Sequence, residues 1–284
     1  MTLSTSFVTA ATRRRTPLLL KLAAGAVIVL MLLAAFAPLL APHDPLAQNV
    51  LARLQGPTTA HWLGTDQFGR DILSRVLYGM RASLGIAVTS VFAALAAGGT
   101  LGLAAAYYRG WTDRIVMRLM DVLFAFPLML LAIGIIAMLG PGARPTAISI
   151  AIVYTPIFAR LLRGPALVIA TSDYVMSARS IGASDVRIIF SHILPNLASV
   201  ILVQLSLLLS SAILVEASLS FLGLGTQPPT PSLGMMLSEG RNMLLLSPWA
   251  AIFSGAAILA IAFALNLLGD VLRDTLDPRL RGQR

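Results

Sequence analysis

The sequence predicts an all-α, polytopic membrane protein with six transmembrane helices. Hydrophobic residues make up 57% of the 284 residues and charged residues only 12%, whereas soluble domains carry about 25% charged residues. Long apolar runs recur along the chain, and a helix needs about 20 mainly apolar residues to cross a hydrocarbon core of about 30 Å. A water-soluble surface is excluded, because this composition would leave large apolar patches exposed.

Six apolar runs are the candidate spans. They cover approximately residues 17–40, 83–108, 122–139, 147–162, 197–218 and 248–272. The third and fourth runs are the shortest, and a segment rich in glycine and proline at 140–145 separates them. Six is therefore the simplest number of crossings.

The first run has a basic start at Arg13, Arg14 and Arg15, as a cleaved signal peptide would. Its apolar stretch is longer than the about 7–15 residues usual for such a segment. The small-residue site at 35–37 is followed by Pro38, which is a poor residue after a cut. We expect an uncleaved membrane anchor.

The distribution of basic residues predicts the orientation. With both termini inside, 15 of the 21 Lys and Arg residues fall in inner segments and 6 in outer ones, as the positive-inside rule requires. The expected organisation is a cytoplasmic tail at 1–16, a first helix with its outer loop at 17–82, a core of five helices at 83–272 and a cytoplasmic tail at 273–284. The core contains a long inner loop at 163–195.

The inner loop mixes small, apolar and charged residues, and it predicts one or two short helices. Ser172 or Asp173 caps the first helix, and Ser184 or Asp185 caps the second. Gly182 lies between them and permits a sharp turn. Two interpretations stay open on physical grounds. The loop either rests on lipid head groups, or it docks on a water-soluble motor and passes rigid-body motion to the spans.

The same loop resembles the "EAA" loop of bacterial ATP-binding-cassette (ABC) importer permeases. That pattern is Glu-Ala-Ala, then Gly four residues on, then Ile-x-Leu-Pro. Here the first three places hold residues 176–178, Gly182, Leu194 and Pro195 match in register, Met176 replaces the Glu and His192 replaces the Ile. The resemblance implies a loop that docks on an ATPase subunit. The candidate docking residues are Asp173, Met176, Ser177, Ala178, Arg179, Gly182, Ala183, Ser184, Asp185, Arg187, Leu194 and Pro195.

Two further stretches resemble the C-type subunit in the dipeptide, oligopeptide and nickel branch of these permeases. They are residues 61–75, after the first span, and residues 216–225 with the proline-rich 226–237, where Leu233 stands in place of a common Trp. The resemblance implies a type I importer fold in the bacterial inner membrane. It also implies a second permease subunit, two ATPase subunits, an extracytoplasmic binding protein, and a peptide, nickel or other small solute as cargo.

The chain lacks the residues for several other functions. Lys21 is the only lysine and no phosphate-binding P-loop exists, so separate subunits would have to hydrolyse ATP. Cysteine is absent, and His43, His61 and His192 are far apart in sequence, so we expect neither a metal site nor a cofactor. The net charge of +9 is explained by inner arginines rather than by nucleic-acid binding.

Several charged or polar residues near the membrane are candidates for a direct role. Glu216 near the outer end of the fifth span either contacts substrate or, as we favour, bonds to loop backbone. Asn266 is deeper and faces the pathway or a neighbouring helix. We expect Asp121 and Asp270 each to be solvated or paired, Asp121 with Arg118 and Asp270 with Arg273. The set Asp66, Arg70, Asp71 and Arg75 predicts an ion-pair network that orders the outer loop, with contact to a binding protein as the alternative.

Two other classes of function remain as alternatives. A stand-alone secondary transporter or channel would need charged residues at mid-bilayer depth and internal repeats. An intramembrane enzyme would need paired catalytic groups at one depth. The sequence shows few such charges, no clear repeat and no catalytic pair, so we expect a non-catalytic permease subunit.

Overall fold

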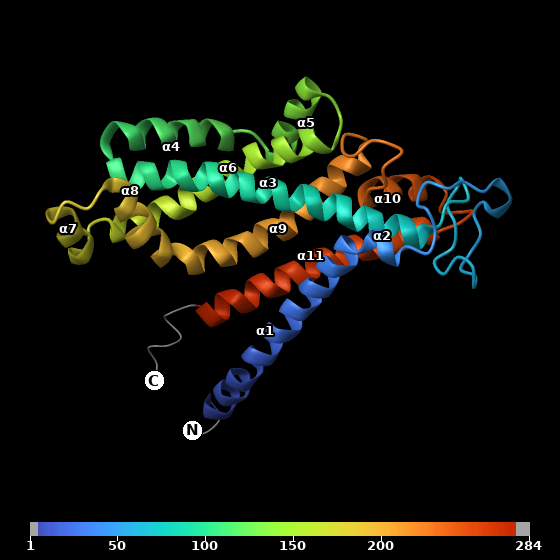
Figure 1. Ribbon diagram of the computed structural model, residues 1–284, viewed down its shortest axis with the longest axis horizontal. Helices are drawn as coiled ribbons and strands as arrows, with labels where there is room; N and C mark the ends of the chain where they lie inside the picture. The colour runs from blue at the N-terminus through green and yellow to red at the C-terminus, as the bar shows by residue number, and fades with distance from the viewer. Residues whose placement is uncertain (1–4, 277–284) are drawn as a thin grey trace.

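The computed structural model describes residues 5–276, and these residues are almost entirely helical (Figure 1). The expected all-α fold is confirmed. The remaining residues, 1–4 and 277–284, belong to the two predicted cytoplasmic tails and lie outside the described part. The helices are α1 (Thr5–Ala35), α2 (Ala37–Leu40), α3 (Ile72–Tyr108), α4 (Gly110–Phe124), α5 (Leu128–Leu139), α6 (Ala143–Ile169), α7 (Asp173–Ser180), α8 (Asp185–Ile188), α9 (Ala198–Phe221), α10 (Leu233–Asn242) and α11 (Trp249–Leu276).

Five helical segments are long and apolar enough to cross a membrane, and a sixth candidate is broken. The five are the apolar part of α1, α3, α6, the continuous segment Asp185–Phe221 and α11. In the sixth candidate, α4 and α5 meet at an angle of 91°. The run at 122–139 is therefore not one straight helix. Pro127 lacks a backbone N–H and restricts the residue before it, so the helix stops there.

Several helices extend beyond the predicted apolar runs. Helix α3 begins at Ile72 rather than near residue 83, because Asp71 caps it by accepting a hydrogen bond from the backbone N–H of Ser74. Helix α6 continues to Ile169 although Pro156 and Pro165 lie within it. The connection between α6 and α8 is therefore shorter than the predicted inner loop at 163–195, and much of that loop is helical.

Helices α3 and α6 form the centre of the bundle, where two glycines of α3 permit a very close approach. A Cβ at Gly98 would overlap the carbonyl oxygen of Thr155, and a Cβ at Gly102 would overlap that of Ala159. This small-xxx-small spacing is typical of tightly packed membrane helices. The backbones of α3 and α6 therefore pack directly on one another.

Replacing Gly102 with isoleucine is expected to separate α3 from α6 and to lower stability by about 3 kcal/mol or more, because backbone rather than a movable side chain blocks the new group. The matched control is Gly85→Ile on the same helix, where a Cβ would meet nothing within 4 Å. The measurement is the thermal unfolding midpoint in detergent. Equal midpoints for the two variants would contradict this account of the interface.

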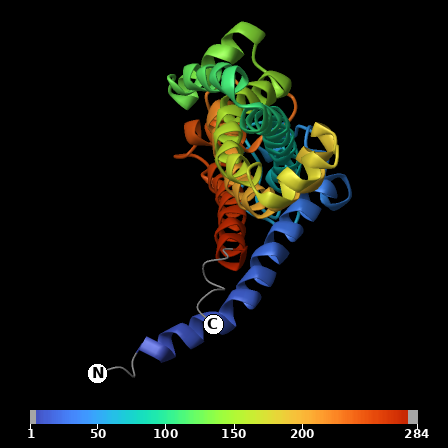
Figure 2. The same cartoon turned by 90° about the vertical axis from the view of Figure 1, so that its left-hand side faces the viewer.

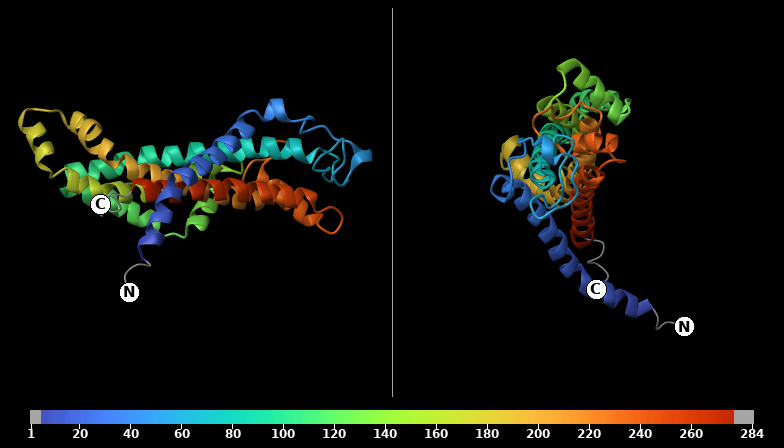
Figure 3. Two further views of the ribbon diagram at one scale, coloured as in Figure 1. Left: turned by 90° about the horizontal axis from the view of Figure 1, so that it is seen from below. Right: turned by 90° about the vertical axis from the view of Figure 1, so that its right-hand side faces the viewer.

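The functional segments lie at opposite ends of an elongated molecule. Helices α7 and α8 form one end, whereas α10 and the loop before α3 form the other (Figures 1 and 3). Helix α1 leaves the bundle at an angle (Figure 2), and only 11% of its apolar window is buried, against 56% for α6. The N-terminal end of α1 and the C-terminal end of α11 lie in the same half of the molecule as α7 (Figure 1).

Candidate functional site

The short helices between α6 and α9 are shaped by local capping. Ser172 and Ser184 occupy the N-cap positions of α7 and α8, and Asp173 and Asp185 are the first helical residues. The Ser184 hydroxyl accepts a hydrogen bond from the Arg187 N–H at 3.4 Å, whereas the Ser172 hydroxyl donates to the Ile169 carbonyl at 2.6 Å. Each acidic residue lies in a first turn, where the helix dipole favours negative charge.

Gly182 ends α7 in a Schellman motif. Its φ is +85°, in the left-handed region that favours glycine. The N–H of Gly182 donates to the Arg179 carbonyl at 3.0 Å, and the N–H of Ala183 donates to the Ala178 carbonyl at 3.1 Å. A Cβ on Gly182 would meet nothing within 4 Å. The glycine is therefore required by backbone conformation, and the space beside it is open.

The loop between α6 and α9 is anchored to the adjacent ends of α3 and α6. The Tyr107 hydroxyl on α3 donates a hydrogen bond of 2.6 Å to the Asp185 carboxylate, and the Arg179 guanidinium lies 4.9 Å from the centre of the Tyr107 ring. A second hydrophobic cluster, separate from the main core, fills the space beneath. Its buried members are Leu103, Ala106, Tyr107, Leu162, Ala166, Val175, Ile188, Ile193 and Leu197. The segment from α7 to α8 is therefore in direct contact with both α3 and α6.

The opposite face of this loop exposes large apolar side chains, which we call the coupling face. The side chain of Ile181 is 86% exposed and that of Val186 65%. The full set is Tyr174, Met176, Ile181, Val186 and Phe190. Exposed apolar side chains of this kind contact either a partner protein or the membrane.

The structure divides the predicted docking residues by exposure. Ala178 is buried, and Ala183 and Leu194 are half-buried. The exposed members are Asp173, Met176, Ser177, Arg179, Gly182, Ser184, Asp185, Arg187 and Pro195. Of the coupling face, sequence reasoning selected Met176 alone. The other coupling-face residues could have been found from the sequence, because large apolar residues are unusual in an otherwise polar loop.

Glu216 and Asn266 lie outside the loop between α6 and α9, and the two residues differ in burial. Glu216 on α9 is fully buried, and its Oε1 accepts a hydrogen bond of 2.7 Å from the Ser220 hydroxyl one turn on. The expected bond from loop backbone to Glu216 is therefore replaced by a bond from a side chain. Asn266 is exposed on α11, so its amide faces whatever surrounds this subunit.

Two ion pairs join α4 to α6. Arg163 binds Asp113 through two contacts of 2.5 Å, and Arg160 binds Asp121 at 2.6 Å. The expected partner of Asp121, Arg118, was wrong, because the neighbouring helix presents a closer cation. Within the described residues Asp270 forms no ion pair with Arg273.

A charged hollow of about 510 Å³ opens between α4 and α6. Its lining residues are Asp113, Arg114, Met117, Arg118, Asp121, Arg160 and Arg163. Arginine outnumbers aspartate in this lining, so the hollow favours anionic groups.

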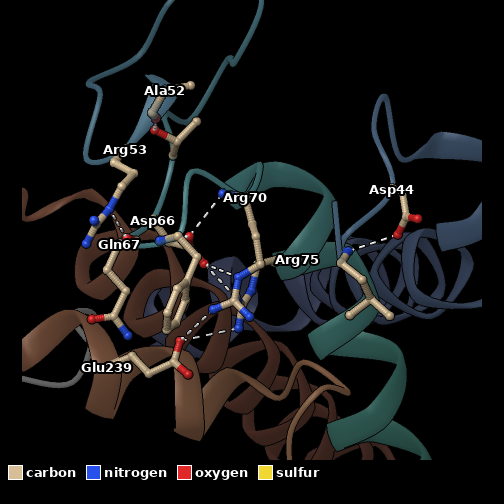
Figure 4. Close-up of polar contacts among 11 residues, drawn as sticks. Asp44, Ala52, Arg53, Asp66, Gln67, Arg70, Arg75 and Glu239 are labelled. Atoms are coloured by element: carbon tan, nitrogen blue, oxygen red, sulfur yellow. Dashed lines mark hydrogen bonds and ion pairs between the residues drawn. The ribbon is translucent and has the colours of Figure 1, made fainter. Parts of the chain in front are cut away.

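At the other end of the molecule, a network of two arginines and two carboxylates joins the start of α3 and the loop before it to α10 (Figure 4). Asp66 accepts from Arg70 at 2.7 Å and from Arg75 at 2.5 Å, and Glu239 of α10 accepts from both arginines at 3.3 Å. The predicted set is thus assembled except for Asp71, which caps α3 instead. Sequence reasoning missed Glu239, because it lies in the other outer loop.

Burial raises the pKa of Glu239, and the nearby Asp66 charge raises it further, while Arg70 opposes both effects. Raising the pKa of a carboxyl group means that ionising Glu239 costs free energy in the folded protein. The two arginines at 3.3 Å offset that cost in part.

The helical bundle, with five candidate spans and one broken candidate, is that of a multi-pass membrane protein. Residues 98–282 match the family described as the inner membrane component of binding-protein-dependent transport systems. Residues 21–57 match the N-terminal transmembrane domain of oligopeptide transport permease C. The chain belongs to the binding-protein-dependent transport system inner membrane component family.

Curated relatives and a solved structure support this assignment. The chain is 50% identical over 263 residues to the glutathione transport system permease protein GsiD of Pectobacterium atrosepticum, covering 91% of this chain and 87% of that protein. It is 46% identical over 251 residues to the dipeptide transport system permease protein DppC of Alkalihalophilus pseudofirmus, covering 88% and 83%. An inward-facing structure of the MetNI methionine ABC transporter superposes with a TM-score of 0.59 at 14% identity, covering 72% of this chain and 98% of that one.

These findings confirm the resemblance to ABC importer permeases and the type I importer fold. They do not favour a stand-alone transporter or channel, because the relatives are permease subunits of larger transport systems. Location in the inner membrane follows from the family and from the apolar helices.

Proposed function

We propose that this chain is one of two permease subunits of an ATP-driven importer for small peptides. A second, related permease would complete the pathway, an extracytoplasmic binding protein would deliver the solute, and two separate ATPase subunits would supply energy. The lipid bilayer surrounds the assembly. The single observation that carries the proposal is the coupling face on a loop that is locked to the central helices.

The mechanism is mechanical. One ATPase subunit covers the exposed apolar side chains around Ile181 and Val186, and closure of the ATPase pair moves this surface as a rigid body. The bond between Tyr107 and Asp185 and the buried cluster beneath α7 pass that movement to α3 and α6. The pathway then alternates between inward-open and outward-open forms.

The proposed orientation has both termini in the cytoplasm. The basic residues of the inner segments support it, as does the position of α7 in the same half of the molecule as the described ends of α1 and α11 (Figure 1). The loop before α3 and helix α10 would then face the extracytoplasmic binding protein.

Peptides are the proposed solute class because the similar permeases act on glutathione and dipeptides. The charged hollow between α4 and α6 adds a physical argument. Its four arginines exceed its two aspartates, which suits a solute that carries a free carboxylate. Asn266, exposed on α11, would contact the second permease or the pathway rather than lipid.

The test uses the tagged chain purified from its native membrane and reconstituted in liposomes. We expect the second permease and the ATPase subunits to co-purify, and ATP-dependent uptake of labelled glutathione or a dipeptide when the binding protein is present. The control is the chain alone in liposomes, which should transport nothing. Transport by the lone chain without ATP would overturn the subunit role. Uptake of a nickel chelate in place of peptides would overturn only the solute class.

A further inference from the structure

Three side chains that are distant in sequence meet at the outer end of the molecule. His43 follows α2, His61 lies in the middle of the outer loop, and Asp71 caps α3. The Asp71 Oδ1 atom lies 3.0 Å from Nδ1 of His61 and 3.8 Å from Nδ1 of His43. The two imidazole rings are 4.7 Å apart, and one nitrogen or oxygen atom from each of the three residues lies within 4.8 Å of the others.

The carboxylate of this group is held in place by other bonds. Asp71 has a fully buried side chain, and its Oδ2 accepts the Ser74 N–H and the Ser74 hydroxyl, both at 2.8 Å. The remaining oxygen, Oδ1, points at the two histidines. The Ser74 hydroxyl also accepts the backbone N–H of His43 at 3.1 Å, so Ser74 positions two of the three residues.

We propose that His43, His61 and Asp71 form a binding site for a divalent transition-metal cation of the zinc type. Imidazole nitrogens and one carboxylate oxygen are a common ligand set for Zn²⁺. Calcium and magnesium prefer oxygen ligands alone. Bond lengths of about 2.0–2.1 Å in a tetrahedral site place ligand atoms about 3.4 Å apart. The two distances to Asp71 are 3.0 Å and 3.8 Å, and all three ligand atoms lie within 4.8 Å of one another.

A fourth ligand position is open to solvent. The side chain of His43 is 41% exposed and that of His61 18%, so water can complete the coordination. The fixed orientation of Asp71 by Ser74 matches the outer-shell bonds that orient ligands in known metal sites.

This site revises the expectation that the chain binds no metal. That expectation rested on the separation of the histidines along the sequence. The folded loop brings His43 and His61 close together in space. A bound cation would fasten the end of the first span and the middle of the outer loop to the start of α3. The proposal concerns only this chain and does not depend on the solute or on the partner subunits.

The test measures Zn²⁺ binding to the purified full-length chain in detergent, with the affinity tag removed, by competition with a chromogenic chelator. We expect one site in the wild type. The variants His43→Gln and His61→Gln are each expected to raise the Kd for Zn²⁺ at least about tenfold, since each removes a ligand. Ser74→Ala, a positioning change, is expected to raise it by about 10-fold to 100-fold.

The matched control is His192→Gln, which alters the third histidine at the opposite end of the molecule and should leave the Kd unchanged. His43 is part-exposed, so its variant should fold, and size-exclusion chromatography checks this. Two results would overturn the proposal. One is a wild type that binds no Zn²⁺ at micromolar concentration. The other is a Kd that the His43 and His61 variants leave unaltered.

Discussion

Replacing Gly182 with valine is expected to lower ATP-driven uptake at least about tenfold, while the amount of protein in the membrane stays near that of the wild type. Gly182 has a φ of +85°, where a residue with a Cβ loses about 1–2 kcal/mol and a β-branched one loses more. Relief of that strain reorients Ile181 and Ala183 and distorts the coupling face. The measurement is solute uptake by reconstituted complexes, with membrane abundance determined by immunoblot.

A second glycine provides the matched control. Gly223 follows α9 at the outer end, has a φ of +80° and, like Gly182, would place a Cβ in open space. Gly223→Val therefore introduces similar backbone strain away from the coupling face, and uptake should be largely retained. Gly182→Asn should also retain uptake, because asparagine tolerates the left-handed region. If both valine variants lost uptake equally, strain in general, and not coupling, would be the cause.

Replacing Arg75 with methionine should cause the largest loss of stability among charged-residue substitutions in the outer loops. The Arg75 side chain is 3% exposed and contacts Asp66 and Glu239. Removing one partner of a buried ion pair costs about 3–5 kcal/mol, because the other charge stays buried without compensation. We expect a clearly lower unfolding midpoint in detergent and a poorer yield of monodisperse protein.

Two comparisons test whether charge is the reason. Arg53→Met removes an exposed guanidinium that donates to the Gln67 carbonyl in the same loop, and it should shift the midpoint little. Adding Asp66→Asn to Arg75→Met removes the carboxylate left unpaired and should recover part of the loss. A double variant whose loss equals the sum of the single losses would show no coupling between Asp66 and Arg75.

The membrane-spanning parts of the fold were predictable because hydropathy depends on composition alone. The runs near 17–40 and 248–272 correspond to the apolar parts of α1 and α11. The break between α4 and α5 was not predicted, because Pro127 lies in an apolar run whose length and hydropathy are those of a single membrane span. The early start of α3 was also missed. Residues 72–82 lie before the apolar run, and Glu239, the partner of Arg75, lies far along the chain.

The candidate site also contains some features that the sequence predicted and others that it did not. The inner loop was found from the register of Gly182, Leu194 and Pro195, because that information is local. The anchoring bond from Tyr107 was not found, since it joins α3 to α8, and four other helices lie between them in the sequence. The proximity of His43 and His61 was not predicted, because the two residues are far apart in sequence, and the fold brings their rings together. Residue spacing along the sequence was enough to predict the motifs. The contacts between motifs could be identified only from the folded structure.

Helix α3 has 37 residues, and at about 1.5 Å per residue it is a rod of about 55 Å, nearly twice the thickness of the hydrocarbon core. Its inner end carries Tyr107 and its outer end carries Arg75, next to the Asp71 cap. A tilt of about 5° at the inner end would displace the far end by about 5 Å. Under the proposed function, motion of the ATPase subunits at one end of α3 and delivery of solute at the other would therefore act on a single rigid rod.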